Sequence, residues 1–406
     1  MEILTPKNAK KRERVSFDAE AVIGTVLEIK SDVINRGDDA LRELTLMFDK
    51  IRIDGFLASP AKMNAAYNSI AKDDLAMLKT AARRIRKVNE AVLASKGDIE
   101  VNGDGYSFKL VSTPISSVGL YVPGGTAFYP SSVLMLGIAA KVAGVPRIVL
   151  CTPPNAADKG IPPITLATAK LVGIDEVYQV GGAQAVFGMA YGTDSIKPAD
   201  KIFGPGNKYV AAAKMFLGDK CGVDIFAGPS EILVLADETA NAEFIRADLL
   251  SQLEHGTDSP CVLVTTSKKL AVEISDLEAN GFIVLVNSIN EGIDFANWYK
   301  AEHTEVMTKD SRGDSMEIQG GAVFIGQNTC VPMGDYGVSG SNHVIPTGGA
   351  ARFQSPVSVE DFMIRTEYTE ATDTNSASFV PRFADLEGLP AHAKAVSLRF
   401  TNFKKQ

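Results

Sequence analysis

The 406-residue sequence has no uninterrupted run of about 18 apolar residues, the length that a membrane-spanning helix requires. The residues that follow Met1 also lack the apolar stretch of a signal peptide. Hydrophobic residues make up 45% of the chain and charged residues 22%, which is typical of a globular protein. We therefore expect a cytoplasmic protein with no membrane partner.

Cysteine is scarce. The cysteines are Cys151, Cys221, Cys261 and Cys330, and they lie far apart and form no CxxC pair. This spacing speaks against a cysteine-based zinc finger and against a disulfide framework. We expect ordinary reduced thiols.

Positive charge is in deficit, because the formal net charge is -8 and the sequence pI is about 5.2. A surface with this balance repels nucleic acid, which is therefore not an expected partner. The one basic run comprises Lys7, Lys10, Lys11, Arg12 and Arg14. We interpret it as the solvated start of a helix, with a binding patch as the alternative.

Helical spacing dominates residues 17–95. The apolar residues at this spacing in the first part are Val22, Val26, Ile29 and Val33. Gly37 follows this stripe, and the aspartates after it can cap a new helix. The pattern predicts one helix that stops at Gly37 and a second that starts there.

From about residue 111 short apolar runs alternate with helical segments. In the first series the predicted strands are 148–150, 177–180 and 202–203, and the helices lie near 133–143, 163–172, 183–191 and 207–217. In the second the strands are 232–235, 262–264 and 282–285, and the helices lie near 240–255, 268–278 and 291–299. This alternation predicts parallel sheets with both faces covered.

A chain of this length is too long for one ordinary core. We predict an α/β fold with two Rossmann-like parallel-sheet domains, a helical N-terminal arm and a small C-terminal appendage. The predicted parts are an arm over 1–20, a discontinuous first domain over 21–120 and 231–353, a second domain over 121–230, and a tail over 354–406. The tail has few apolar residues before a last helix near 391–399.

Histidine is rare, and all four copies lie beyond residue 250. Gln252 and His255 are three residues apart at the end of a predicted helix that Gly256 terminates, so they share one face of its last turn. Their amide oxygen and imidazole nitrogen could bind one metal ion. The alternative is a histidine that only stabilises the end of the helix through the helix dipole.

Glu302 and His303 place a carboxylate beside an imidazole at the predicted start of a short strand. Neighbouring residues of a strand point to opposite faces, so both reach one site only if the backbone there is irregular or the site wraps round it. The pair suits acid-base chemistry, because a glutamate can polarise water and a histidine changes its charge near neutral pH.

Further donors follow in the last part of the chain. Asp335 and His343 flank a glycine-containing loop, and Glu387 and His392 lie on either side of a bend that contains glycine and proline. Nitrogen and oxygen donors without cysteine suit zinc, and they also suit manganese, cobalt or nickel.

Glycine-rich segments occur at 119–125, 181–182, 204–207 and 228–231. Several follow a predicted strand and precede a helix, where open α/β sheets bind ligands. None is a GxGxxG motif with an acidic residue ~20 positions further on. The spacing therefore predicts ligand-binding loops without specifying a dinucleotide.

Taken in order, these segments resemble the histidinol dehydrogenase family from about residue 20 to the end of the chain. The resemblance is carried by GLYVPGG, VYQVGGAQAV, DKIFGPGN, AGPSEILVLAD, DLLSQLEHG, the Glu302-His303 pair, GDYGVSGSNHVIPT and EGLPAHA. It implies NAD-linked oxidation of histidinol to histidine by way of histidinal, in a homodimer with one Zn²⁺ per subunit and exchanged C-terminal tails. The first predicted domain would then hold zinc and the amino alcohol, and the second would hold NAD.

The resemblance also implies a role for each matching residue. The zinc ligands would be Gln252, His255, Asp335 and His392. The acid-base pair would be Glu302 and His303, and the NAD contacts would be Tyr121, Gln184 and Asn207. The substrate contacts would be Ser230, His303, His343 and Glu387 together with the four zinc ligands.

The sequence departs from the family pattern at two places. Ala301 and Thr304 flank the acid-base pair where the family usually has proline and leucine, and Phe128-Tyr129 replaces a smaller or more aliphatic pair. The alternatives are a dehydrogenase of another small polar alcohol, a cysteine-based aldehyde dehydrogenase, a zinc hydrolase and a non-catalytic metal-binding protein. Cys261 is the one cysteine close in sequence to a candidate histidine.

Overall fold

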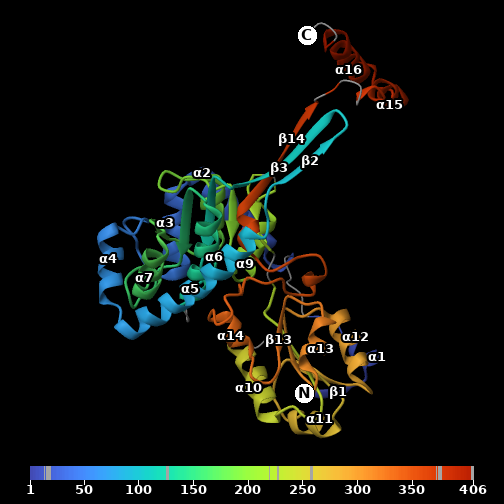
Figure 1. The fold of residues 1–406 in the computed structure, drawn as a ribbon. Helices are drawn as coiled ribbons and strands as arrows, with labels where there is room; N and C mark the ends of the chain where they lie inside the picture. The colour runs from blue at the N-terminus through green and yellow to red at the C-terminus, as the bar shows by residue number, and fades with distance from the viewer. Residues whose placement is uncertain are drawn as a thin grey trace. The chain divides into compact units, whose positions relative to one another are not determined.

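The computed structural model describes residues 1–12, 14, 20–124, 128–218, 220–225, 228–256, 259–371, 373 and 377–403 (Figure 1). The chain divides into a first unit of Met1–Val92 and Ile115–Phe362 and a second unit of Leu93–Pro114 and Met363–Gln406. Residues 17–19 of the predicted helical region and Gly125 of the first glycine loop lie outside the described residues.

Sheet A of the first unit is parallel throughout and has the strand order β1-β11-β10-β9-β12-β13. Its strands are β1 (Glu2–Leu4), β9 (Ile232–Ala236), β10 (Cys261–Thr265), β11 (Gly281–Leu285), β12 (His303–Met307) and β13 (Ala322–Ile325). The chain runs outward from β9 to β11, returns to β12 on the other side of β9, and continues to β13. The topological switch point of sheet A therefore lies between β9 and β12.

Sheet B of the first unit is also parallel and has the order β6-β5-β4-β7-β8. Its strands are β4 (Ser117–Tyr121), β5 (Arg147–Thr152), β6 (Glu176–Gln179), β7 (Lys201–Phe203) and β8 (Gly222–Val223). Its switch point lies between β4 and β7. The two sheets confirm the predicted α/β fold.

Helices cover both sheets (Figure 1). Those near sheet B are α2 (Ile23–Arg36), α3 (Asp38–Asp49), α4 (Pro60–Ser69), α5 (Lys72–Ala94), α6 (Pro130–Ala143), α7 (Pro163–Val172), α8 (Gly182–Tyr191) and α9 (Lys208–Met215). Those near sheet A are α1 (Pro6–Ala9), α10 (Ala242–Gln252), α11 (Lys268–Ile274), α12 (Ile289–Tyr299), α13 (Ser311–Met316) and α14 (Val331–Asp335). Short 3-10 turns are Glu20–Val22, Leu253–His255, Ala350–Arg352 and Val359–Phe362.

Sheet A buries alternate residues of each strand on opposite faces. Ile232, Val234 and Leu263 pack in one core with residues of α10 and α11. Leu233 and Val262 pack in another core with residues of α1 and α12. Continuous apolar strands such as ILVLA at 232–236 follow from this double burial.

The cores divide differently from the predicted grouping of 21–120 with 231–353. Val26, Leu41 and Phe56, which lie in or after α2 and α3, share a core with Val149 and Ile202 of sheet B. The N-terminal helices therefore pack on the sheet that follows them in sequence. An apolar stripe shows that a helix has a buried face, but it does not show which sheet covers that face.

The sequence predicted a helical N-terminal arm, but the residues of the arm that the structure describes are not mainly helical. Its first residues form β1, which pairs with β11, and among its described residues before Glu20 only the four of α1 are helical. The amino group of Met1 donates to the carbonyl of Leu277 at 3.0 Å. This contact ties the start of the chain to the part of the first unit that is built on sheet A, called here the A-sheet lobe; the part built on sheet B is the other lobe.

The second unit combines an antiparallel sheet with a helical hairpin. Sheet C has the order β14-β3-β2, from β2 (Ile99–Gly103), β3 (Tyr106–Pro114) and β14 (Met363–Ala371). The helices are α15 (Val380–Leu386) and α16 (Pro390–Phe403). Among its described residues only Ala384 is buried, while apolar side chains such as Phe379, Phe383 and Leu386 are exposed.

In the part of the chain that the structure describes, no helix is both long enough and apolar enough to cross a membrane.

Candidate functional site

Glu302 and His303 meet at the amino end of β12, beside the start of β9. Glu302 precedes the strand, and its Oε2 lies 3.6 Å from Nδ1 of His303, so the two side chains lie close together. Ser230 Oγ donates to Glu302 Oε2 at 2.5 Å, and the Glu231 amide donates to the same oxygen at 2.9 Å. Both members of the pair are almost fully buried.

Burial moves the two groups of this pair in opposite directions. It raises the pKa of Glu302 to about 8, against hydrogen bonds from Ser230 and Glu231 that lower it. It lowers the pKa of His303 to about 3, and the nearby His255 adds to this effect. His303 is therefore neutral at neutral pH and able to accept a proton. Glu302 titrates close to neutral pH, which suits a general base.

Two of the residues proposed as metal donors, Asp335 and His255, lie near His303. Asp335, at the end of α14, places Oδ1 at 3.9 Å from Nε2 of His303, and burial raises its pKa to about 6. Gln252 ends α10 and is 2% exposed. His255 ends the following 3-10 turn before Gly256, as the sequence predicted.

His255 is exposed, but the surrounding protein still lowers its pKa. The charge of His255 acts on both His303 and His343, and that of Asp335 acts on Glu302. The structure thus gathers these side chains into one electrostatic cluster.

His343 links the lobes of the first unit. Its Nε2 lies 2.9 Å from Ser132 Oγ of α6, and its backbone amide approaches the sulfur of Met135 at 3.2 Å. Since α6 follows the carboxyl end of β4, this contact joins the carboxyl edge of sheet B to the acid-base cluster. Burial lowers the pKa of His343 to about 4, against a hydrogen bond to the backbone of Asp335 that raises it.

The residues proposed to contact NAD lie at the carboxyl edge of sheet B. Tyr121 ends β4 and Asn207 precedes α9 after β7, so they stand on the two strands of the switch point. Gln184 lies in the first turn of α8, after β6. The Gly182 amide donates to the hydroxyl of Tyr121 at 3.1 Å and ties the β6–α8 loop to β4.

The loop at 228–231 lies between β8 and β9 and does not lead into a helix. Ser230 and Glu231 precede β9, so the acid-base cluster lies at the amino edge of sheet A, opposite to the edge at which such sheets usually bind ligands. The other three glycine segments do follow β4, β6 and β7 and precede α6, α8 and α9.

Glu387 and His392 lie in the second unit and are exposed. Glu387 caps α15, Gly388 has a φ of +73°, and α16 begins at Pro390, so the predicted bend is present.

The donor set fits a metal ion in its chemistry. Gln252 Nε2 is buried and has no hydrogen-bond partner, and because the two ends of an amide are exchanged by a flip, its oxygen can take this position. Imidazole, carboxylate and amide oxygen are all zinc donors. In the described residues no group of three or more histidine, cysteine, aspartate or glutamate side chains is placed to hold a metal. Of the proposed zinc ligands that such a count includes, His255 and Asp335 belong to the first unit and His392 to the second.

The carboxyl edge of sheet B, which is proposed to bind NAD, also has a buried amide atom without a hydrogen-bond partner. Gln184 is 1% exposed, and its Oε1 has no hydrogen-bond partner in the structure. An unsatisfied buried amide oxygen at the edge of a parallel sheet is able to accept a hydrogen bond from a ligand.

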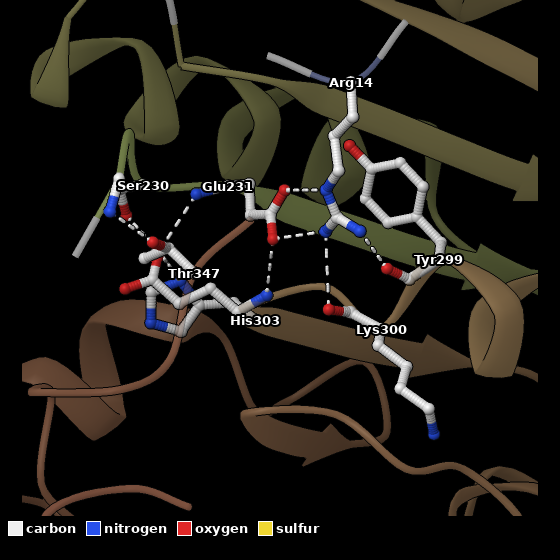
Figure 2. A network of polar contacts seen from close by, with 9 residues as sticks. Arg14, Ser230, Glu231, Tyr299, Lys300, His303 and Thr347 are labelled. Atoms are coloured by element: carbon white, nitrogen blue, oxygen red, sulfur yellow. Dashed lines mark hydrogen bonds and ion pairs between the residues drawn. The ribbon is translucent and has the colours of Figure 1, made fainter. Parts of the chain in front are cut away.

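Sequence reasoning missed several buried charges around the site. Arg14, interpreted as a solvated residue, forms an ion pair with Glu231, and Figure 2 shows its guanidinium beside Tyr299 and Glu231. Glu305 is fully buried on β12 and neighbours the carboxyl of Asp248. Charged residues signal burial only through their partners, which a single sequence does not reveal.

Glu305 makes the stability of the folded chain depend on pH. Burial and the neighbouring Asp248 raise the pKa of Glu305 from 4.5 to about 9. The folded chain therefore keeps a proton that the unfolded chain releases above pH ~4.5, so stability falls as the pH rises from there to about 9. We expect Glu305→Gln to remove up to ~1.4 kcal/mol per pH unit of this slope.

Urea unfolding of both proteins at about pH 6 and about pH 8 measures this difference. The exposed Glu278→Gln is the matched control and should keep the wild-type slope. Equal slopes in wild type and Glu305→Gln would show that Glu305 is ionised in the folded protein.

The structure is an α/β fold in which His343 connects α6, at the carboxyl edge of sheet B, with the cluster around the buried Glu302 and His303. The family model described as histidinol dehydrogenase matches residues 12–400. The chain belongs to the histidinol dehydrogenase family and is an oxidoreductase.

Curated relatives named histidinol dehydrogenase are similar over nearly the whole chain. The protein from Methanothermobacter thermautotrophicus is 42% identical over 95% of each chain. That from Bradyrhizobium diazoefficiens is 43% identical over 96% of this chain and 94% of its own.

Solved structures agree with these relatives. Histidinol dehydrogenase from Elizabethkingia anophelis superposes with a TM-score of 0.92 at 35% identity, over 100% of this chain and 99% of that one. An acetylating aldehyde dehydrogenase from Geobacillus thermoglucosidasius is 12% identical with a TM-score of 0.50, over 90% and 94% of the two chains, and shares the fold alone.

Proposed function

We propose that the protein oxidises L-histidinol to L-histidine by way of L-histidinal, with NAD as the hydride acceptor and one Zn²⁺ per subunit. The observation that carries this proposal is the buried Glu302-His303 pair, whose carboxyl and imidazole groups lie 3.6 Å apart, with the proposed zinc ligand Asp335 at 3.9 Å from His303. Membership of the histidinol dehydrogenase family supplies the substrate. The location in the cytoplasm stays a prediction.

His303 acts in the first oxidation. Burial keeps its ring neutral, so a ring nitrogen is free to take the proton of the substrate hydroxyl while the hydride leaves for NAD. One NAD⁺ is reduced and the aldehyde forms. The burial of His303 also keeps water away from the transferring hydride.

Glu302 acts in the second oxidation. Its ionised carboxylate takes a proton from water, the water oxygen bonds to the aldehyde carbon, and the hydride of the resulting hydrate reduces a second NAD⁺. Ser230 and the amide of Glu231 both donate to Oε2 and hold the carboxyl group in place, and Oε1 would act on the water.

Gln252, His255 and Asp335 would hold the zinc ion, with His392 of the partner subunit as the fourth ligand. Zinc, when bound, supplies a positive charge that fixes the amine and imidazole of the substrate. Ser230, His343 and Glu387 of the partner subunit would complete the substrate pocket together with His303 and the ligands. A carboxylate such as Glu387 matches a substrate amine.

Tyr121, Gln184 and Asn207 would bind NAD at the switch point of sheet B. Phe128 is exposed next to this edge of the sheet, so the departure from the family pattern there changes the surface that a cofactor passes.

A homodimer with exchanged tails is proposed because the second unit lacks a core of its own. Its exposed apolar side chains include Ile99, Ile364, Phe379, Phe383 and Leu386. Such a surface needs a partner that covers it. A second copy of the chain supplies one, and exchange would carry Glu387 and His392 to the neighbouring site.

Co-expression of a His392→Ala chain with a His255→Ala chain tests the exchange. If the tails cross, a mixed dimer contains one site with both defects and one with neither, so we expect up to half of the wild-type activity. If each tail stays on its own subunit, every site keeps one defect and isolated mixed dimers stay inactive.

The alternative functions differ in the nucleophile, cofactor or substrate that they require. A thiolate mechanism is disfavoured because Cys261 is fully buried, burial raises its pKa to about 12, and its thiol donates to the Leu249 carbonyl. A zinc hydrolase would need no NAD, and a dehydrogenase of another alcohol would prefer that alcohol. Purified zinc-loaded protein supplied with histidinol and NAD is expected to release histidine. Failure to form histidine, with turnover of a different amino alcohol, would assign the chain to another substrate.

A further inference from the structure

Arg14 reaches into the A-sheet lobe from the N-terminal arm (Figure 2). Its Nη2 lies 2.5 Å from Glu231 Oε1 and its Nε lies 3.3 Å from Oε2, so the ion pair is two-pronged. The guanidinium also donates to the carbonyls of Tyr299 and Lys300, and it lies 4.1 Å from the centre of the Tyr299 ring. Together these contacts hold the side chain of Arg14 in a single geometry.

The backbone around Arg14 leaves room for it. Gly349 has a φ of +76°, and a Cβ there would lie 2.5 Å from Nη1 of Arg14. The Gly349 backbone also hydrogen-bonds to the carboxyl of Glu231. The loop after Thr347 therefore closes over the guanidinium only because residue 349 is glycine.

Glu231 holds Glu302 at two points. Its Oε1 accepts the backbone amide of Glu302 at 3.2 Å, and its own amide donates to Glu302 Oε2 at 2.9 Å. Glu231 is 1% exposed, and a buried carboxylate needs a counter-charge. Among the described residues Arg14 is the cation that pairs with it.

We propose that Arg14 is a positioning residue for Glu302, because its guanidinium neutralises and orients Glu231, which in turn fixes both the backbone and the carboxyl group of Glu302. Arg14 would act through Glu231 and not directly on the substrate or the cofactor. The inference rests on the proposed role of Glu302 as the base of the second oxidation. The N-terminal arm would then help to position a residue of the active site, which a solvated basic run would not do.

The central variant is Arg14→Met, which removes the charge and keeps a similar length. We expect kcat for histidinal oxidation to fall about 10-fold to 100-fold, at or below the lower end of the ~10²–10⁴ that loss of an acid-base group costs. The rate of oxidation of histidinol to histidinal should fall less than about threefold, because this step uses His303. It is measured as formation of the first NADH in a single turnover. KM for histidinal and the zinc content should stay unchanged.

The matched control is Arg12→Met. Arg12 lies on the same arm, but its guanidinium pairs with exposed Glu2 and lies over Phe282. This variant should keep both half-reactions within about twofold of wild type, as expected of a surface ion pair. If the control and the wild type also fail to reduce NAD with histidinol, the proposed function is wrong, whereas a defect confined to Arg14→Met speaks to Arg14 alone.

The route through Glu231 is tested by the double variant Arg14→Met with Glu231→Gln. The glutamine keeps an oxygen for the Glu302 amide but carries no charge, so we expect the double variant to recover at least about fivefold of what Arg14→Met loses. Arg14→Lys, which keeps a charge without the two-pronged geometry, covers the case in which Arg14→Met does not fold, and should show a smaller loss that is confined to the same half-reaction. Equal losses in both half-reactions, or a double variant no better than Arg14→Met, would overturn the proposal.

Discussion

Replacing Glu302 by glutamine is expected to slow the oxidation of histidinal by ~10²–10⁴ while the oxidation of histidinol falls far less. Only the second step needs an activated water. The amide preserves the acceptor for Ser230 Oγ and for the Glu231 amide, so the geometry around residue 302 should persist. The measurement is a single-turnover assay with histidinol and, separately, with supplied histidinal.

The matched control is Glu278→Gln, an exposed glutamate on the same lobe, which should leave both rates unchanged. Equal losses in the two half-reactions of Glu302→Gln would mean that Glu302 serves the whole reaction, and the division of labour between Glu302 and His303 would be abandoned.

Replacing His255 or Asp335 by alanine is expected to remove most of the bound zinc and to abolish turnover. Each variant leaves the first unit with one fewer strong donor beside Gln252. The fold should persist, because sheets A and B are covered by helices and do not depend on these side chains. Elemental analysis for zinc and far-ultraviolet circular dichroism measure the two halves of this prediction.

Asp276→Ala is the control for these variants, since Asp276 is an exposed acid that pairs with Arg246. It should bind zinc as the wild type does. Full zinc occupancy in both His255→Ala and Asp335→Ala would refute the ligand assignment.

The parallel strands could be predicted from the sequence because both of their faces are buried. VYQV at 177–180 and ILVL at 232–235 are short apolar or near-apolar runs, and they form β6 and β9 within a residue or two of the predicted bounds. The helices that flank them end at glycines with positive φ, such as Gly144 and Gly173, which are visible as stop signals.

The antiparallel sheet of the second unit gave no such signal. β2 and β14 are exposed along nearly their whole length, so their sequences carry little apolar pattern. β14 also pairs with β3 across about 250 residues of sequence, as in Met363 opposite Pro114. A pairing of this range depends on the whole fold and leaves no local pattern.

The candidate site residues could be predicted from their chemistry, whereas the residues that hold them in position could not. Rare histidines and a carboxylate next to one of them already pointed to Glu302 and His303. Arg14 and Glu231 became visible only when the fold placed them together, because an arginine in a basic run has the same local pattern whether it is solvated or paired.

The most direct test of the central claim is the number of NADH molecules formed per histidinol consumed, measured with purified zinc-loaded protein, limiting histidinol and excess NAD. If one buried site carries out both oxidations, the ratio is two, histidine is the product, and no free histidinal accumulates. A ratio of one with release of the aldehyde would show an ordinary alcohol dehydrogenase, and a ratio of zero would contradict the proposed function altogether.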